Sequence, residues 1–202
     1  TCLAVVTVND VTAPTTLCKD TTVYLDATGN VAIDSSYVDN GSTDACGPLS
    51  MTVIPNTFTC SNTGTNTITL TVSDGSGNSS TCNSIVTVLD TLRPTAICKS
   101  ATIQLDPTGN ATLAPMQIDN GSFDGNCVSV TLSASKTAFT CADTGVNNVT
   151  LYVTDASGNV DSCVAVVTVE DNIAPNAMCQ NDTVYLDATG NVSITGTQLD
   201  GG

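Results

Sequence analysis

Cysteine residues recur along this chain with an almost constant period. Cys18, Cys98 and Cys179 follow one another at intervals of about 80 residues, a length typical of a small domain. The same interval separates Cys46 from Cys127, Cys60 from Cys141, and Cys82 from Cys163. A regular period constrains the fold strongly, because each repeat must be one structural unit stacked against similar neighbours. The sequence therefore predicts a tandem array.

A recurrent stretch marks the junctions of this array. Residues 74–94 hold a glycine-rich acidic turn, a cysteine, an alternating apolar run, and an Asp followed four residues later by Pro; residues 155–175 repeat the pattern. This pattern predicts the last strand of one domain and the hinge into the next. We expect residues 1–10 to end one repeat, residues 11–90 and 91–171 to form two whole repeats, and residues 172–202 to begin another, as a piece of a longer protein.

Short alternating runs predict an all-β fold. Thr67 to Val72 (T-I-T-L-T-V) and Ser84 to Leu89 alternate apolar and polar residues, which is typical of half-buried strands. The motifs D-A-T-G-N at Asp26 and D-P-T-G-N at Asp106 are turn signals between such runs. Strands at this spacing, without a helical period, indicate antiparallel β-sandwich domains.

The composition excludes several functions. The chain has 19 acidic and four basic residues, a net charge of −15 and no His. This charge argues against nucleic acid or an anionic membrane as a partner. We find no catalytic constellation, and every acidic motif repeats with the domain, so we expect no enzyme. No apolar run is long enough to span a bilayer.

Four cysteines per repeat predict disulfides, because a small domain usually needs covalent cross-links. Zinc is the alternative, but there is no C-x-x-C motif and no His. If the first and last strands lie parallel, Cys18–Cys82 and Cys98–Cys163 form, which leaves Cys46–Cys60 and Cys127–Cys141. A rival set is Cys82–Cys98, Cys2–Cys18 and Cys163–Cys179; under our choice, Cys2 and Cys179 pair elsewhere. Disulfides imply an extracellular, oxidising location.

The motifs resemble a known family. D-G-S-G-N before a cysteine and a terminal strand, D-N-G-S-T-D before a second cysteine, and the proline hinge are similar to the hyalin repeat (HYR), an immunoglobulin-like module. The sequences C-K-D-T-T-V-Y-L-D-A-T-G-N and F-T-C-S-N-T-G-T-N-T-I-T-L-T-V resemble repeats of large Bacteroidota surface adhesins of the SprB gliding-motility type. The two cysteines of the hyalin pattern match Cys18 and Cys82.

The resemblance implies tandem immunoglobulin-like domains, export by a type IX system and a place at the cell surface. It also implies a possible O-glycosylation pattern, Asp-Ser/Thr followed by an apolar residue or Thr, which matches Thr21, Thr91 and Thr183.

The direction of the strands predicts a calcium site at each junction. Asp90 ends a last strand and should meet the top of the next repeat, where we expect Asp119, Asp124 and Asp155. Clustered carboxylates repel one another unless a cation joins them, and calcium prefers oxygen ligands. The full set of candidate ligands is Asp10, Asp39, Asp44, Asp74, Asn78, Asp90, Asp119, Asp124, Asp155, Asn159 and Asp171. The alternative is that these residues only cap turns.

These observations favour a structural stalk of an extracellular bacterial adhesin, stiffened by disulfides and calcium. The expected partners are neighbouring repeats, with surface glycans or proteins bound by regions outside this sequence. The alternatives are a subunit of a self-assembling fibre, in which like chains associate, and a spacer in a secreted hydrolase.

Overall fold

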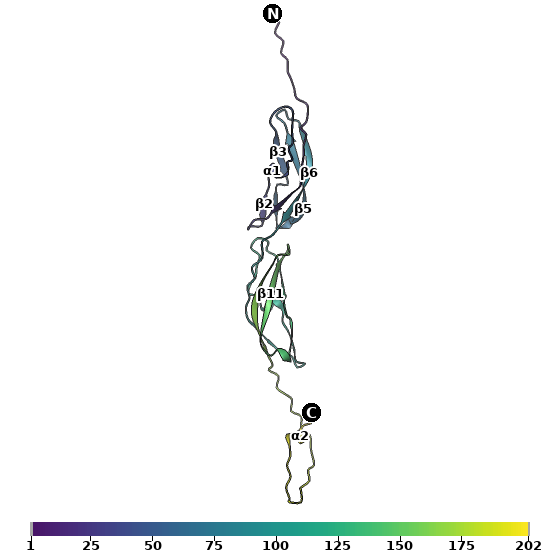
Figure 1. Ribbon diagram of the computed structural model, residues 1–202, viewed down its shortest axis with the longest axis vertical. Coiled ribbons are helices and arrows are strands. Elements are labelled where there is room, and N and C mark those ends of the chain that lie inside the picture. The colour runs from purple at the N-terminus through teal and green to yellow at the C-terminus, as the bar shows by residue number, and fades with distance from the viewer. Residues whose placement is uncertain (1, 202) are drawn as a thin grey trace.

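The computed structural model describes residues 2–201, which form two β-sandwich units joined end to end (Figure 1). The first unit contains six strands, and the second contains six that correspond to them in order. The chain enters at one end of this elongated molecule and leaves at the other, where α2 (Gly196–Leu199) follows. No helix in the described chain is long and apolar enough to cross a membrane.

The first unit is built on a four-stranded sheet with the order β1-β6-β5-β3. These strands are β1 (Thr21–Tyr24), β6 (Ser79–Leu89), β5 (Gly64–Ser73) and β3 (Ser50–Ile54). The opposite layer pairs β2 (Asn30–Ala32) with β4 (Thr57–Thr59), flanked by α1 (Ser35–Val38) and η1 (Cys60–Asn62). The first strand β1 is parallel to the last strand β6, as the sequence predicts, and the other pairs are antiparallel.

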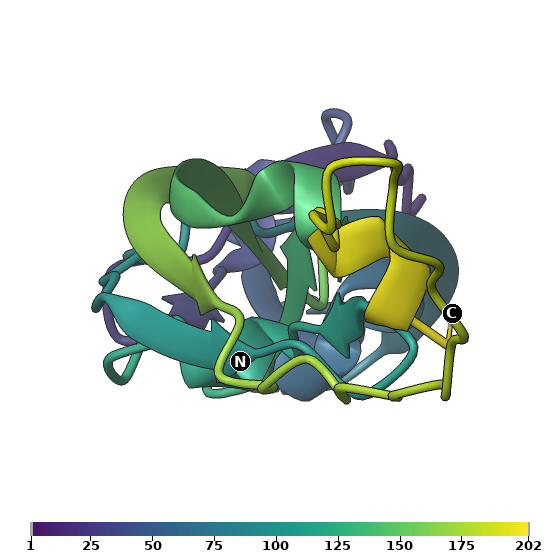
Figure 2. The same cartoon turned by 90° about the horizontal axis from the view of Figure 1, so that it is seen from below.

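The second unit repeats this topology with the order β7-β12-β11-β9. Its strands are β7 (Ala101–Gln104), β12 (Val160–Glu170), β11 (Gly145–Asp155) and β9 (Val130–Ala134). The small sheet pairs β8 (Asn110–Thr112) with β10 (Ala138–Thr140), and the short helical turns are η2 (Pro115–Gln117) and η3 (Cys141–Asp143). Seen from below, the two units overlap along the long axis, and the C-terminal segment, in yellow, lies over part of them (Figure 2).

Each unit has its own hydrophobic core, produced by the alternation of its central strands. Ile68, Leu70 and Val72 of β5 are fully buried, and Thr between them faces outward. Phe58 and Phe139 fill equivalent places in the two cores. Burial of such side chains stabilises each by about 1.5–3 kcal/mol. The fold is therefore an all-β immunoglobulin-like sandwich, as expected.

The D-x-T-G-N turn of the first unit, at Asp26 to Asn30, lies at the junction with the second unit. The Asp26 carboxylate accepts hydrogen bonds from the backbone N–H of Thr28 and of Asn30, at 2.8 and 3.1 Å. Gly29 has a φ of 74°, a conformation that other residues rarely adopt. Because the Asp accepts these bonds in its ionised form, the hydrogen bond from the Thr28 hydroxyl and those from the backbone hold the pKa of Asp26 below its ordinary value.

Candidate cation site and disulfide at the junction

Three carboxylates from two units meet at the central junction. Asp90 follows β6, Asp124 lies in the loop before β9, and Asp155 ends β11. Their relative exposures are only 7%, 6% and 5%. Burial of ionised carboxylates costs free energy unless hydrogen bonds or a cation compensates them. Sequence analysis placed these three residues together, and the structure brings them to the same junction.

Asn159 connects the hinge to the acidic turn of the second unit. Its side-chain Nδ2 donates to the Asp90 carbonyl at 3.1 Å and to Asp155 Oδ2 at 2.8 Å. The backbone N–H of Asn159 donates to Asp155 Oδ1 at 2.8 Å. The acidic turn is therefore closed by hydrogen bonds to Asp155, and one amide connects it to the residue after β6. The candidate ligand Asn159 serves here as a donor through its nitrogen.

Asn126 makes the second connection across the junction. Its Nδ2 donates to Asp90 Oδ1 at 2.8 Å, and the backbone N–H of Leu92 donates to the same oxygen at 3.1 Å. The side-chain Oδ1 of Asn126 is buried and has no hydrogen-bond partner. A buried oxygen without a donor is costly, and it is also the type of oxygen that binds a hard cation. Sequence analysis did not select Asn126, because it lies outside the repeated D-N-G-S-x-D motif.

The charge of this cluster is not balanced by an ion pair. One oxygen of Asp90, one of Asp124 and the sulfur of Cys127 lie within 4.8 Å of one another. The Cys127 sulfur is in a disulfide, so it contributes no thiolate. Within residues 2–201, one ion pair has its charged atoms within 4 Å of each other, and it joins Lys136 to Asp143 in another part of the second unit. The junction therefore combines buried negative charge with acceptor oxygens.

The other basic residues act on carboxylates outside the buried cluster. Burial raises the pKa of Asp119, but hydrogen bonds from Ser122 and Gly121 and the charge of Lys99 outweigh it and lower the pKa overall. The pKa of Asp161 is lowered by the backbone N–H of Ala96 first, and Arg93 adds a smaller effect.

A related cluster lies at the start of the first unit, where Ala45 stands at the position that corresponds to Asn126. Asp10, Asp44 and Asp74 each place one oxygen within 4.8 Å of the others. The side-chain amide of Asn78 donates to the Asp10 carbonyl at 3.1 Å and to Asp74 Oδ2 at 2.8 Å, like Asn159 at the central junction. Asp10 Oδ2 is buried without a partner. The two sites therefore share the amide link from Asn78 or Asn159 and a buried oxygen without a partner, whereas Asn126 and the disulfide belong to the central junction alone.

The remaining candidate ligands lie elsewhere. The carboxylates of Asp39 and Asp119 accept hydrogen bonds within their own loops, from Ser42 and Ser122 respectively. Asp171 lies at the outgoing end of the second unit, where its carboxylate accepts from the backbone of Ile173 at 3.1 Å. Of the possible O-glycosylation sites, Thr21 is in β1, Thr91 is in the hinge, and Thr183 follows the second unit.

Three disulfides are present in the described chain. Cys18–Cys82 and Cys98–Cys163 form within the units, as the parallel first and last strands predict. The third joins Cys60 of the first unit to Cys127 of the second, with their Cα atoms 5.6 Å apart. It adds a covalent link between units, beside the buried carboxylates.

The expected pairs Cys46–Cys60 and Cys127–Cys141 are therefore wrong. The segment from Cys46 to Cys60 contains β3 and β4, which run along the length of the unit and place its ends far apart. A disulfide requires Cα atoms no more than about 6.8 Å apart, so these cysteines cannot meet. Cys46 and Cys141 are free and exposed, as are Cys2 and Cys179, so the rival pairs Cys82–Cys98, Cys2–Cys18 and Cys163–Cys179 do not form either. The direction of the strands was the signal that could have revealed this, because it places Cys46, just after the D-N-G-S-T-D loop, at the opposite end of the unit from the central junction.

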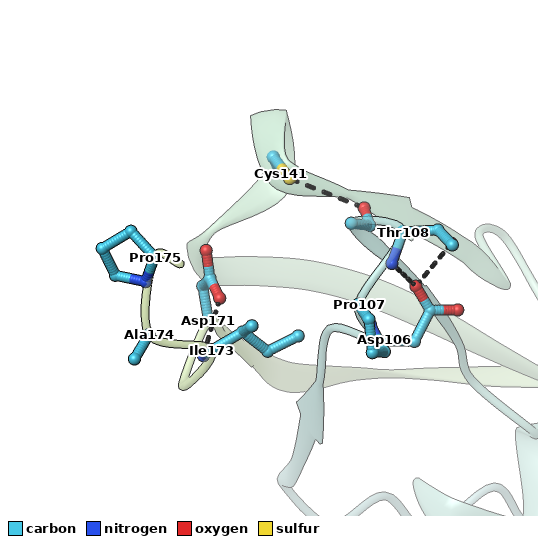
Figure 3. A pocket seen from close by; sticks show the side chains of 9 residues that line it. Asp106, Pro107, Thr108, Cys141, Asp171, Ile173, Ala174 and Pro175 are labelled. Atoms are coloured by element: carbon cyan, nitrogen blue, oxygen red, sulfur yellow. Dashed lines mark hydrogen bonds between the residues drawn. The ribbon is translucent and has the colours of Figure 1, made fainter. Parts of the chain in front are cut away.

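A hollow at the outgoing end of the second unit has the same components as the first unit's side of the central junction. Asp106 to Gly109, Cys141 and the segment from Asp171 to Pro175 line it (Figure 3). The Cys141 sulfur lies 3.7 Å from the Gly109 carbonyl oxygen, and the Cys60 sulfur lies 3.7 Å from that of Gly29. Cys141 is therefore placed in its unit as Cys60 is in the first unit.

Comparisons with known proteins give structural likeness only. No protein-family model and no curated protein matches the chain. Among solved structures, human protocadherin-24 EC1-2 is 15% identical with a TM-score of 0.40, covering 79% of this chain and 99% of that one. Human mucin-like protocadherin EC1-2 is 15% identical with a TM-score of 0.37, covering 77% of this chain and 98% of that one. Sidekick-1 immunoglobulin domains 1–4 are 9% identical with a TM-score of 0.40, covering 78% of this chain and 49% of that one. With TM-scores below 0.5 the likeness is loose, and the immunoglobulin-like class rests on the strand order described above.

Proposed function

We propose that this chain is a stretch of an extracellular stalk whose unit junctions bind calcium. The observation that carries the proposal is the buried set of Asp90, Asp124 and Asp155 together with the unpartnered Oδ1 of Asn126. Calcium takes six to eight oxygen ligands in irregular geometry, and extracellular modules bind it with a Kd of about 10⁻⁴–10⁻³ M. When bound, the ion would neutralise the carboxylates and join the two units.

The disulfides support an extracellular, structural role. Each unit has a small core and one internal disulfide, a combination typical of secreted domains. We place the repeats at residues 11–90 and 91–171, with partial repeats on either side. The motifs that resemble HYR repeats favour a large bacterial surface adhesin exported by a type IX system, with Thr21, Thr91 and Thr183 as candidate glycan sites. The neighbouring repeats are the partners that the geometry supports best.

A calcium titration of matched variants tests the ion. We expect Asp90→Asn to remove one calcium site per chain, measured by isothermal titration calorimetry or by terbium luminescence. The control is Asp171→Asn, since Asp171 is the equivalent residue at the outgoing end and is exposed in this chain. Equal binding by wild type and Asp90→Asn would refute the assignment of the central site.

Thermal unfolding gives a second measure of the same site. A ligand that binds only the folded protein stabilises it by about 2.7 kcal/mol when its concentration is a hundred times Kd. Wild type and Asp171→Asn should gain stability with calcium in the millimolar range. Asp90→Asn should gain less, because only the site at Asp10, Asp44 and Asp74 remains.

A further inference from the structure

Two covalent routes run along the array, and each uses a small part of every repeat. The first goes from Cys82 along β6 and through the hinge to Cys98, a stretch of about 16 residues that reaches about 55 Å when fully extended. It continues across the Cys98–Cys163 bond to β12 and the next hinge. The disulfide bypasses the 65-residue separation between Cys98 and Cys163. This first route therefore omits most of the fold of each unit.

The second route crosses the junction through sulfur. It goes from Cys46 along β3 and β4 to Cys60, a stretch of about 14 residues that reaches about 50 Å when fully extended. The Cys60–Cys127 bond then enters the second unit, bypassing a sequence separation of 67 residues that includes the whole hinge. From Cys127 the route follows β9 and β10 to Cys141, a stretch of the same length as that from Cys46 to Cys60.

We propose that these disulfides make the array a cable that cannot lengthen by unfolding. A tensile force on a repeat protein normally unravels domains, and a repeat of about 81 residues would extend to about 280 Å at about 3.5 Å per residue. Here the load passes through about 14 to 16 residues per repeat, which reach only about 50–55 Å plus the disulfide. The property belongs to the bond pattern and does not require calcium.

About half of each route is already extended in the folded protein. Cys82 and Cys163 are the fourth residues of β6 and β12, so eight residues of each strand lie on the first route. The second route contains the eight residues of β3 and β4, or of β9 and β10. Strands rise about 3.3 Å per residue, close to the fully extended limit, so these parts lengthen little under load. The non-strand residues of the route are therefore the part that can straighten before the disulfides carry the load.

Cys46 and Cys141 are the open ends of the second route. Cys141 occupies the place of Cys60, beside a D-x-T-G-N turn, and Cys46 follows an acidic loop as Cys127 does. In a longer array each would pair with a cysteine of an adjoining repeat of this kind. The two thiols lose two protons and two electrons to form the bond, and the disulfide of a thiol oxidoreductase accepts them and becomes a dithiol.

Pulling on these two thiols tests the cable directly. DNA handles are attached to Cys46 and Cys141 in a Cys2→Ser, Cys179→Ser background, and the protein is stretched in optical tweezers with chelator present. With Cys60–Cys127 intact, the load path is two stretches of about 14 residues and one disulfide, which together reach only about 100 Å between the handles. The distance between the handles should therefore not exceed about 100 Å, and the force–extension curve should show no large unfolding step.

Removal of the link gives the matched comparison. In Cys60→Ser, Cys127→Ser the shortest route runs through Cys18–Cys82 and Cys98–Cys163, and the limit should rise to about 230 Å. Full reduction of wild type should release the whole segment between the handles, about 330 Å. An oxidised wild-type protein that extends to about 230 Å or more would overturn the proposal. Because chelator is present, this outcome is independent of the calcium site.

Discussion

The side-chain amide of Asn126 in the second unit donates a 2.8 Å hydrogen bond to Asp90 at the end of the first. Both residues are buried, and the side-chain oxygen of Asn126 has no partner. The candidate cation site is therefore made by two units together, and neither unit alone contains it. An ion bound there would shift the equilibrium between arrangements of the two units toward the one that it binds most tightly. The free energy of this shift is set by the difference in the ion's affinity for the different arrangements.

Peptide mapping without reduction should recover a peptide pair linked by Cys60 and Cys127. Cys18–Cys82 and Cys98–Cys163 should also be linked, whereas Cys46 and Cys141 should react with alkylating reagent before reduction because they are exposed. A linked Cys46–Cys60 peptide would contradict the structure, because these residues lie at opposite ends of the unit.

Gly29→Ala should weaken the junction. A Cβ at this position would lie 2.4 Å from the Asn126 carbonyl oxygen and 2.7 Å from the Cys60 sulfur. The backbone φ of 74° adds a cost of roughly 1–2 kcal/mol for any L side chain. We expect a lower melting temperature and slower formation of the Cys60–Cys127 bond during oxidative refolding. Alkylation of samples taken during refolding, and mass spectrometry of the products, measure the rate at which the bond forms.

The control for this variant is Gly190→Ala in the third copy of the same turn. Gly190 has a φ of 82°, and a Cβ there would meet nothing within 4 Å. The Gly190→Ala variant has the conformational cost without the clash, so the Cys60–Cys127 bond should form in this variant at the wild-type rate. Equal rates for Gly29→Ala and Gly190→Ala would show that the turn does not position the link.

Acid should release the hydrogen bond that joins the start of the second unit to β12. The Ala96 N–H donates to Asp161 Oδ2 at 2.9 Å, and this bond lowers the pKa of Asp161 below the ordinary 3.8. Because the folded pKa is depressed, the stabilisation is complete above about pH 4 and is lost as pH falls through the folded pKa. The Ala96 amide proton shift, followed by NMR, should titrate with a midpoint below 3.8 and be flat in Asp161→Asn. A midpoint above 3.8 would contradict the assigned bond.

Much of the fold follows from local pattern. The alternation at Thr67 to Val72 specifies which side chains of β5 are buried, and the period of the cysteines specifies that the units repeat. The disulfide Cys18–Cys82 follows from the expected parallel pairing of the first and last strands, which β1 and β6 show.

The junction was harder to predict, because it depends on which loops meet. The direction of β6 and β11 places Asp90 near Asp155, and this follows from sequence. Asp119 was expected at the site, but its carboxylate is engaged by Ser122 in its own loop. The link from Cys60 to Cys127 was missed because Cys46 and Cys60 were paired as the two cysteines left over in their repeat, whereas Cys60 lies at the end that meets the second unit.

The central claim is that calcium fixes the arrangement of the two units, and the Cys60–Cys127 bond must be removed to test it. Spin labels on Ile85→Cys and Val166→Cys, two equivalent exposed positions of β6 and β12, report the distance between units by double electron–electron resonance in a protein whose Cys2, Cys46, Cys141 and Cys179 are replaced by Ser. In Cys60→Ser, Cys127→Ser we expect a narrow distance distribution with millimolar calcium and a broad one with chelator, since the unneutralised carboxylates repel. Adding Asp90→Asn should abolish the calcium response, and the protein with Cys60–Cys127 intact should give a narrow distribution in both conditions. A distribution in Cys60→Ser, Cys127→Ser that is the same with calcium and with chelator would contradict the account.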